Sequence, residues 1–171
     1  QLEQEVVHEH GVAFDVRQEH LEHVVAVARQ RIALDDLAAR PGGVEPWDGV
    51  RNYQARNFLR DELREGDEVF IYHSSCAVPA VVGLARVASA PRPDPTQFDP
   101  GAPGFDPKSD PAAPRWYLVD IRYERHLPRP VTLAELKARR DELAGFALLE
   151  RPRLSVMPVS DSEWMAILAM R

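Results

Sequence analysis

Apolar and polar side chains alternate along several stretches of this chain, and a period of two predicts β-strands. The predicted strands span residues 68–74, 80–88, 115–127 and 153–158. In the longest of them one alternating set is expected to face the core, namely Tyr117, Val119, Ile121 and Tyr123. Gly83 interrupts the apolar run of residues 80–88, so we expect a bulge or a close backbone approach there.

Helical spacing of apolar residues, with capping residues in front, predicts the helices. The predicted helices span residues 16–29, 33–39, 52–63, 133–140 and 141–149, and a last one follows Ser160. Asn52 is a good N-cap for the third of them. Thr132 with Glu135, and Ser160 with Glu163, have the spacing of a capping box.

The first 32 residues allow two interpretations. Leu21, Val24, Val25 and Ala28 follow helical spacing, but residues 24–27 could equally form a short strand. The segment is acidic and holds four of the six histidines, which are His8, His10, His20 and His23. No cysteine joins these histidines and no third ligand is placed beside them, so we favour a solvated polar face over a metal site.

Short strands separated by short helices, without regular β–α–β alternation, predict an α+β fold. We expect a small mixed β-barrel with short helices at its rim. Residues 89–114 are rich in Pro, Asp and Gly and are expected to form a long loop, which is too short to link two domains. We therefore expect one domain over residues 34–171, preceded by an atypical, helical N-terminal segment over residues 1–33.

Composition limits the kinds of partner. The chain has 171 residues and a net charge of −6, so its surface as a whole does not attract polyanions. Any nucleic-acid contact must be local, or made through one extruded base. Cys76 is the single cysteine, which excludes an internal disulfide and indicates a reducing compartment, the cytoplasm. No apolar run is long enough to span a membrane, so we expect no membrane partner.

The densest candidate chemistry lies at residues 46–58, where aromatic, amide and guanidinium groups surround one Asp-Gly turn. Trp47 would offer a flat face to a planar ring, and Asn52 a mixed donor and acceptor edge. Arg51 and Arg56 would meet an anion such as phosphate. The alternative is a half-buried Trp47 in the core, beside two solvated arginines.

A second basic stretch covers residues 115–140, with seven basic residues against three acids. It is a candidate phosphate-facing patch. A solvated face is at least as well supported by the sequence.

Four motifs, in order, carry a resemblance to a known family. They are WDGVRNYQARNF at 47–58, YHSS at 72–75, PDPTQFD at 93–99 and RLSV at 153–156. Over roughly residues 34–171 the chain closely resembles the EVE domain family, which includes many small stand-alone bacterial members. The resemblance implies a PUA-like barrel with helices at its rim, related to the YTH readers of methylated adenine in RNA. It also implies a non-enzymatic reader of a modified base.

The resemblance implies a role for each matching residue. Trp47 would stack on the base or wall its pocket, and Asn52 and Ser74 would hydrogen-bond its edge. The residues that would shape the pocket are Tyr72, His73 and Asp94. The residues that would contact phosphate are Arg51 and Arg56. No catalytic residue, cofactor or metal is implied.

The beginning of the chain departs from the family pattern. EVE domains usually open with a strand that runs into a lysine-serine-glutamate-proline motif, whose end lines the binding pocket. No such motif is present in residues 1–33. Either residues 24–28 supply the first strand with different chemistry, or the strand is lost, or a frameshift or misassigned start has replaced it.

Two other functions compete with a base reader. The neighbours His73, Ser74, Ser75 and Cys76 suggest an enzyme, but adjacent residues of a strand point to opposite faces. A protein-interaction adaptor without base binding would use the N-terminal helix, if its apolar face were exposed. We therefore expect no enzyme, but a reader of methylated or hydroxymethylated cytosine in DNA, or of a modified base in RNA. A monomer is favoured.

Overall fold

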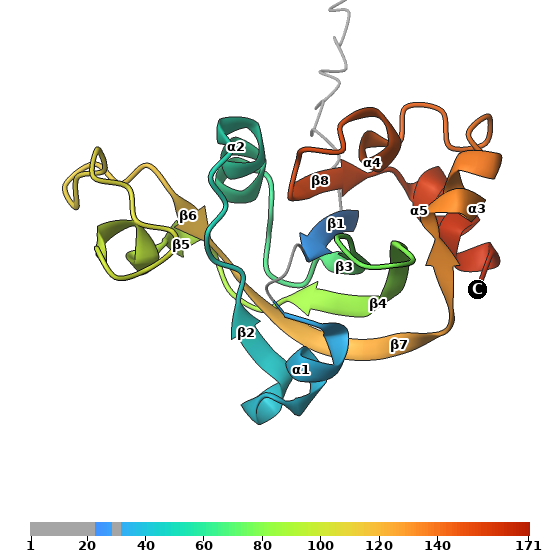
Figure 1. The fold of residues 1–171 in the computed structure, drawn as a ribbon, viewed down its shortest axis with the longest axis horizontal. Helices are drawn as coiled ribbons and strands as arrows, with labels where there is room; N and C mark the ends of the chain where they lie inside the picture. Colours follow the sequence, from blue (N-terminus) through green and yellow to red (C-terminus); the bar gives the residue numbers. More distant parts are fainter. Residues whose placement is uncertain (1–22, 29–31) are drawn as a thin grey trace, which may run out of the picture.

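One curled sheet organises the part of the chain that the computed structural model describes, residues 23–28 and 32–171. Its strands lie in the order β2-β7-β4-β3-β1-β8, and only β1 and β3 are parallel neighbours. Their bounds are β1 His23–Ala28, β2 Val44–Pro46, β3 Glu68–His73, β4 Ala80–Val87, β7 Asp120–Thr132 and β8 Val156–Val159. Figure 1 shows the sheet bending into half a barrel, which confirms the predicted α+β fold with a small mixed barrel.

Short helices surround this sheet. They are α1 Leu34–Ala39, α2 Tyr53–Asp61, α3 Leu133–Ala138, α4 Ala147–Glu150 and α5 Asp161–Ala169, with 3-10 turns η1 Pro41–Gly43 and η2 Pro95–Phe98. The predicted caps are confirmed: Asn52 Oδ1 accepts from the Ala55 N–H at 3.0 Å, and Thr132 and Ser160 each form a capping box. No helix in the described ranges is long and apolar enough to cross a bilayer.

β1 corrects the helix predicted over residues 16–29. The part from His23 to Ala28 is a strand, in register with β3, where Val27 lies opposite Tyr72, and also paired with β8. The alternative strand is confirmed, because Val24 and Val25 are 1% and 0% exposed, as in a strand covered on both faces. The predicted helix before His23 lies outside the described residues. The sheet thus includes residues ahead of the boundary expected at 34.

The strands predicted over residues 68–74 and 80–88 are confirmed as β3 and β4, to within one residue at their ends. Gly83 lies where the register of β4 shifts against both neighbouring strands. A Cβ at this position would lie 2.2 Å from Leu34 Cδ2 and 2.6 Å from the Arg125 carbonyl oxygen. The absent side chain therefore lets α1 and β7 approach β4, and the bulge and the close approach are both confirmed.

The strand predicted over residues 115–127 is divided. β6 (Tyr117–Leu118) pairs with β5 (Arg92–Pro93) in a separate ribbon, and β7 then begins and runs to residue 132. The predicted inward set does pack in or against the core. Trp116 and Leu118, from the opposite set, are buried as well. Trp116 and Leu118 are buried on this side because the chain leaves the main sheet here and contacts the long loop that precedes it.

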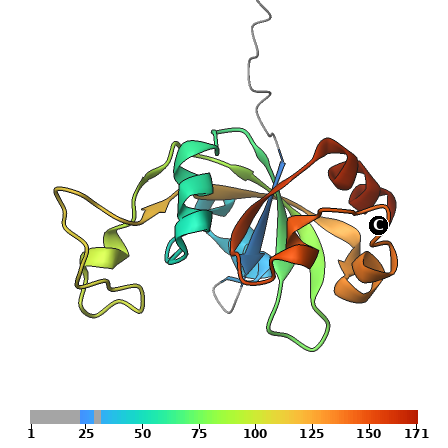
Figure 2. The same cartoon turned by 90° about the horizontal axis from the view of Figure 1, so that it is seen from above.

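That loop, residues 94–116, is called the arm below. Figures 1 and 2 show it reaching away from the sheet, at the end opposite α3, α4 and α5. Gln97 is fully buried in it and donates to the carbonyl oxygens of Asp94 at 2.6 Å and Trp116 at 2.9 Å. Gln97 Oε1 accepts from the N–H groups of Arg115 and Trp116, both at 3.1 Å. A buried amide therefore orders a segment that has few apolar residues.

Candidate functional site

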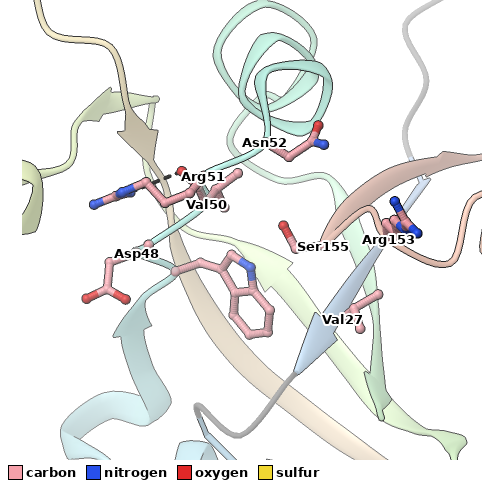
Figure 3. A pocket seen from close by; sticks show the side chains of 9 residues that line it. Val27, Asp48, Val50, Arg51, Asn52, Arg153 and Ser155 are labelled. Carbon is pink, nitrogen blue, oxygen red and sulfur yellow. Dashed lines mark hydrogen bonds between the residues drawn. The ribbon is translucent and has the colours of Figure 1, made fainter. Parts of the chain in front are cut away.

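A pocket of about 270 Å³ opens beside the segment that precedes α2 (Figure 3). Three segments that are far apart in the sequence build it: the end of β1, residues 47–52, and the residues just before β8. The lining residues are Val27, Trp47, Asp48, Gly49, Val50, Arg51, Asn52, Arg153 and Ser155. The pocket therefore depends on the tertiary fold and not on one local motif.

The segment of residues 47–52 forms the first wall. The Trp47 backbone N–H donates to the Val119 carbonyl oxygen at 2.8 Å, which ties this segment to the sheet. Gly49 has φ of 66°, a conformation that glycine adopts without steric cost. Residues 47–52 form no hydrogen-bonded turn or bend, so the turn predicted at Asp48-Gly49 is wrong, and irregular backbone leads from β2 to α2. The Gly49 N–H donates to Asp94 Oδ2 of the arm at 2.7 Å. Trp47 is 5% exposed, so its indole belongs to the core and walls the pocket at once.

β1 and the residues before β8 form the second wall. The Val27 N–H donates to the Ser155 carbonyl oxygen at 2.8 Å, which holds the two segments side by side. Val27 is buried, Ser155 is half-buried and Arg153 is exposed. Trp47 and Ser155 line the same pocket, and Figure 3 shows Arg153 at the edge of this space.

Several polar groups in the pocket form no hydrogen bond or ion pair within the described part of the chain. They are the Trp47 indole N–H, the Asn52 side-chain NH₂, the Ser155 hydroxyl and the Arg153 guanidinium. Asn52 uses only its Oδ1 atom, as the helix cap. All four groups are donors, and only the hydroxyl can also accept. The pocket therefore suits a ligand that presents acceptors or negative charge.

Arg51 also lines the pocket, but Figure 3 shows its guanidinium directed away from these groups. Nη1 donates to Asp94 Oδ2 at 2.9 Å, and Nη2 donates to Thr96 Oγ1 at 3.0 Å. Nε donates to the Gly104 carbonyl oxygen at 2.9 Å. Protein acceptors from the arm thus already hold this guanidinium, and the predicted phosphate contact of Arg51 stays a prediction.

Asp94 is the buried centre of these contacts, with a relative exposure of 0%. Its Oδ1 accepts from the Thr96 N–H at 2.9 Å and from the Thr96 hydroxyl at 2.6 Å. Burial alone would raise the pKa of this carboxyl, but the hydrogen bonds from Thr96, Arg51 and Gly49 outweigh burial and hold the pKa below its usual range. Asp94 does not line the pocket, but it accepts hydrogen bonds from two residues that do, Gly49 and Arg51.

Tyr72, His73 and Ser74 lie at and just beyond the end of β3 and are not among the lining residues. Tyr72 is buried opposite Val27, and burial raises the pKa of its phenol. His73 Nε2 accepts from the Leu34 N–H at 3.1 Å, and burial lowers the pKa of this imidazole. Ser74 Oγ is buried without a partner among the described residues. The structure therefore brings Trp47, Arg51 and Asn52 together at the pocket. It places Tyr72, His73 and Ser74 at the end of the neighbouring strand β3.

Arg56 lies on the arm side of α2 and does not line the pocket. It donates to the Arg115 carbonyl oxygen, and its Nε donates to Asn57 Oδ1 at 2.7 Å. Its guanidinium lies 5.0 Å from the Tyr53 ring centre and 5.8 Å from that of Trp116. These contacts anchor the arm to α2, and the predicted phosphate contact of Arg56 stays a prediction.

The basic stretch at residues 115–140 is not a uniformly free cationic surface. Three of its members are ion-paired, as Arg129 with Glu135, Arg139 with Glu142 and Arg140 with Glu150. Paired and solvated charges of this kind fit the alternative interpretation of the stretch.

Of the four N-terminal histidines only His23 lies within the described residues. Its ring nitrogens lie 3.0 Å from Asp161 Oδ1 and 3.2 Å from Glu68 Oε2. In the described ranges no group of three or more His, Cys, Asp or Glu side chains is arranged to hold a metal ion.

Sequence reasoning did not assign Val27, Arg153 or Ser155 to the site. The RLSV motif contains the last two, so its place in the family resemblance was the available signal. No local pattern shows that the end of β1 lies beside the segment of residues 47–52. The position of β1 follows from its pairing with β8.

The EVE domain family model matches residues 23–170 of the chain. Human thymocyte nuclear protein 1 is 40% identical over 147 residues, which cover 82% of this chain and 65% of that protein. An uncharacterised protein of Schizosaccharomyces pombe is 46% identical over 127 residues, which cover 74% of this chain and 53% of that protein. The chain thus spans between 53% and 65% of the length of these two curated relatives.

Solved structures share both fold and sequence with the chain. The human THYN1 protein in complex with 5-methylcytosine-containing DNA has a TM-score of 0.83 and 35% identity, and the match covers 86% of this chain and 96% of that chain. A protein from Pseudomonas putida has a TM-score of 0.80 and 40% identity, with 86% of this chain and 98% of that chain covered.

Proposed function

The chain belongs to the EVE domain family, and on that premise we propose that it is a non-enzymatic module that binds nucleic acid through one modified base. The observation that carries the proposal is the pocket in which Trp47, Asn52 and Ser155 present polar groups that have no partner in the described part of the chain, beside an apolar wall. Such a pocket suits a flat ring that carries hydrogen-bond acceptors on one edge and a small apolar substituent on another.

The size of the pocket favours a single base. Its volume of about 270 Å³ lies just below the roughly 300–1,000 Å³ of sites for drug-sized ligands. A base in a duplex must leave the stack before it enters, which costs a few kcal/mol. Single-stranded or mismatched sites are therefore expected to bind more tightly than a fully paired duplex.

The walls would recognise different parts of the base. The Trp47 indole offers a flat surface, and base–aromatic stacking contributes about 1–3 kcal/mol. The N–H groups of Trp47 and Asn52, with the Ser155 hydroxyl, would bind the oxygen and nitrogen acceptors of the ring. Val27 and Val50, which are 3% and 2% exposed, would contact a methyl group.

We propose 5-methylcytosine in DNA as the first base to test, because the human THYN1 structure contains DNA with this base. Cytosine carries O2 and N3 as acceptors, and its C5 methyl group lies on the opposite side of the ring. The pocket offers donors and apolar surface to match both sides. 5-Hydroxymethylcytosine and a modified base in RNA are alternative outcomes of the same test.

The two competing functions have less support. An adaptor would need an exposed apolar face, but Val24 and Val25 are buried inside the sheet. An enzyme would need a nucleophile paired with a base, but His73 Nε2 accepts from a backbone N–H. The Cys76 thiol contacts the His73 carbonyl oxygen at 3.9 Å and not its ring.

The proposal is tested by titrating the purified chain with short fluorescent oligonucleotides. The panel holds unmodified cytosine, 5-methylcytosine, 5-hydroxymethylcytosine and N6-methyladenine, each in single-stranded and duplex DNA and in RNA. We expect the dissociation constant to be lowest for a modified base, and lower in single-stranded than in duplex DNA. Equal affinity for every oligonucleotide, or no binding to any of them, would refute the proposal.

Asn52→Asp is the variant that links binding to the pocket. Aspartate keeps the capping oxygen of α2 but replaces the amide donors with a negative charge, so folding should persist while binding falls at least tenfold. Asn57→Asp is the matched control, because it makes the same charge change on the exposed side of α2, outside the pocket. Equal losses from both variants would show that only the overall charge matters.

A further inference from the structure

Arg153 is an exposed cation at the edge of the pocket (Figure 3). Its guanidinium forms no hydrogen bond or ion pair with any residue of the described ranges. We propose that Arg153 binds a phosphate group of the nucleotide whose base enters the pocket, an inference that rests on the proposed function. A guanidinium matches two phosphate oxygens in shape and charge.

The backbone around Arg153 fixes where its side chain starts. Leu154 is 6% exposed, and its N–H donates to the Arg151 carbonyl oxygen at 3.1 Å, so the segment forms a tight turn anchored in the core. The Val27 N–H binds the Ser155 carbonyl oxygen at 2.8 Å, which fixes the other end of the segment against β1. Arg153 therefore sits at the mouth of the pocket, while Ser155 lies inside its wall.

The covalent structure of a nucleotide supports separate roles for Ser155 inside the pocket and Arg153 at its mouth. A base reaches its phosphate through the sugar, so a base inside the pocket leaves a phosphate at the mouth. Ser155 and Arg153 are two residues apart. Ser155 is half-buried in the pocket that Trp47 also lines, while Arg153 is exposed at its edge (Figure 3). Base and phosphate of one nucleotide could thus be held by one short segment.

Arg153 is also the available arginine of the pocket. Arg51 is the other arginine in the lining, and acceptors of the arm hold its guanidinium. Moving Arg51 toward a phosphate would leave the buried carboxylate of Asp94 without its ion pair, which is costly. Within the described ranges, Arg153 has no hydrogen bond or ion pair to lose when it binds an anion.

The test combines a protein variant with a ligand variant. The ligand is single-stranded DNA with one 5-methylcytosine, in which the phosphate on its 5′ or 3′ side is replaced by an uncharged methylphosphonate. We expect Arg153→Gln to weaken binding of the all-phosphate strand about tenfold, as for a hydrogen-bonded charge contact. One of the two methylphosphonate strands should bind the wild-type chain equally weakly. Against that strand Arg153→Gln should have no further effect.

Arg151→Gln is the matched control, because Arg151 has the same charge, is also exposed, and does not line the pocket. We expect it to change affinity less than twofold and to add independently to the methylphosphonate effect. The slope of log affinity against log salt should fall by about one for Arg153→Gln.

Two results would overturn the inference and leave the proposed function standing. One is that the loss of affinity from Arg153→Gln adds fully to the loss from each of the two methylphosphonates, while the modified base is still preferred. The other is an equal loss from Arg151→Gln. A wild-type chain that binds no modified strand at all would instead refute the proposed function. These readouts keep the two failures apart.

Discussion

Arg51 and Arg153 line the same pocket from opposite walls, and their guanidinium groups have opposite surroundings. On the first wall, the side chain of Arg51 is held by Asp94, Thr96 and Gly104 of the arm. On the second wall, Arg153 and the Ser155 hydroxyl have no hydrogen-bond or ion-pair partner among the described residues. Residue type and position in a pocket therefore do not show whether an arginine binds a ligand. An arginine whose contacts are complete stabilises the pocket, and one without contacts is available to a ligand.

The same contrast separates stability from affinity. Substitutions among the groups that hold Arg51 should lower the free energy of unfolding, because they break contacts that exist in the folded chain. Substitutions of Arg153 or of the Ser155 hydroxyl should leave that free energy unchanged and lower the affinity for a modified base. The following variants test this separation in order of decreasing effect.

Asp94→Ala should produce the largest loss. It leaves the Arg51 guanidinium and the Gly49 N–H without their acceptor. We expect a loss at the lower end of the roughly 3–5 kcal/mol seen when a buried ion pair is broken, because the Arg51 side chain is 24% exposed. Urea unfolding measures this. Asp61→Ala, which removes an exposed carboxylate paired with Arg60, should leave the free energy of unfolding nearly unchanged.

Acid tests the same contact in the unmodified chain. The pKa of Asp94 is lowered on folding, so its contribution to stability is present above the usual carboxyl pKa of about 3.9. The contribution is lost as the pH falls through the lower, folded-state pKa. Asp94→Asn should therefore show a shallower loss of unfolding free energy below about pH 4 than the wild-type chain. Identical pH profiles would contradict the role assigned to the carboxylate.

Gly104→Ala should produce the next largest loss. A Cβ at this position would lie 2.6 Å from Arg51 Nη2 and 2.8 Å from Thr96 Oγ1, so the guanidinium would have to leave its acceptors. We expect a loss of about 1–3 kcal/mol, as for other overpacked sites, measured by thermal and urea unfolding. Gly101→Ala is the control within the arm, since its nearest neighbour would be the Asp99 carboxylate at 3.3 Å. An equal effect of both variants would mean that the arm responds to any added side chain.

Ser155→Ala should act on binding alone. Its hydroxyl forms no hydrogen bond within residues 23–28 and 32–171, so the free energy of unfolding should change by less than about 0.5 kcal/mol. Affinity for the modified base should fall by about 0.5–1.5 kcal/mol, the usual net value of one hydrogen bond. Ser89→Ala is the converse control, because Ser89 Oγ accepts from the Asp120 N–H at 2.8 Å. It should destabilise the fold and leave affinity unchanged.

Val27→Thr should produce the smallest effect. It replaces one methyl group on the pocket wall with a hydroxyl of similar size, so it removes apolar contact with a methylated base. The preference for 5-methylcytosine over cytosine should fall by about 0.8 kcal/mol, the value of one buried CH₂ group. Val25→Thr, at a buried position outside the pocket lining, should change stability without changing this preference. An unchanged preference in Val27→Thr would place the methyl group elsewhere.

Much of the fold follows from the sequence, because period-two alternation and capping residues act locally. β3, β4, α2 and the capped helices lie close to where those patterns place them. β1 is the main exception, because a short run of valine and alanine fits a helix as well as a strand covered on both faces. The neighbouring strands that decide between them, β3 and β8, begin far along the chain. The division of β6 from β7 has a similar cause, since the contacts that bury Trp116 within the arm are not visible in local periodicity.

The candidate site follows from the sequence only in part. Trp47, Asn52 and Arg51 are close together in the chain, and the short segment between β2 and α2 keeps them together. Val27, Arg153 and Ser155 join them through strand pairing, which no spacing rule reveals. The partner of Arg51 was equally hidden, because Asp94 lies 43 residues away. Burial and hydrogen-bond partners, which decide whether a charge is used or available, are properties of the folded chain.

The most direct measurement follows the indole N–H signals in a ¹H–¹⁵N NMR titration with single-stranded DNA that carries one 5-methylcytosine. The chain has three tryptophans, and each signal can be assigned with a Trp→Phe variant. The Trp47 indole N–H lies at the pocket and has no hydrogen-bond partner among the residues that the structure describes, whereas that of Trp116 donates to Asp106 Oδ2 in the arm at 2.7 Å. We predict that the Trp47 signal shifts with added DNA and that the Trp116 signal stays in place. A shift of Trp116 with an unmoved Trp47 would contradict base binding in this pocket and move the contact to the arm.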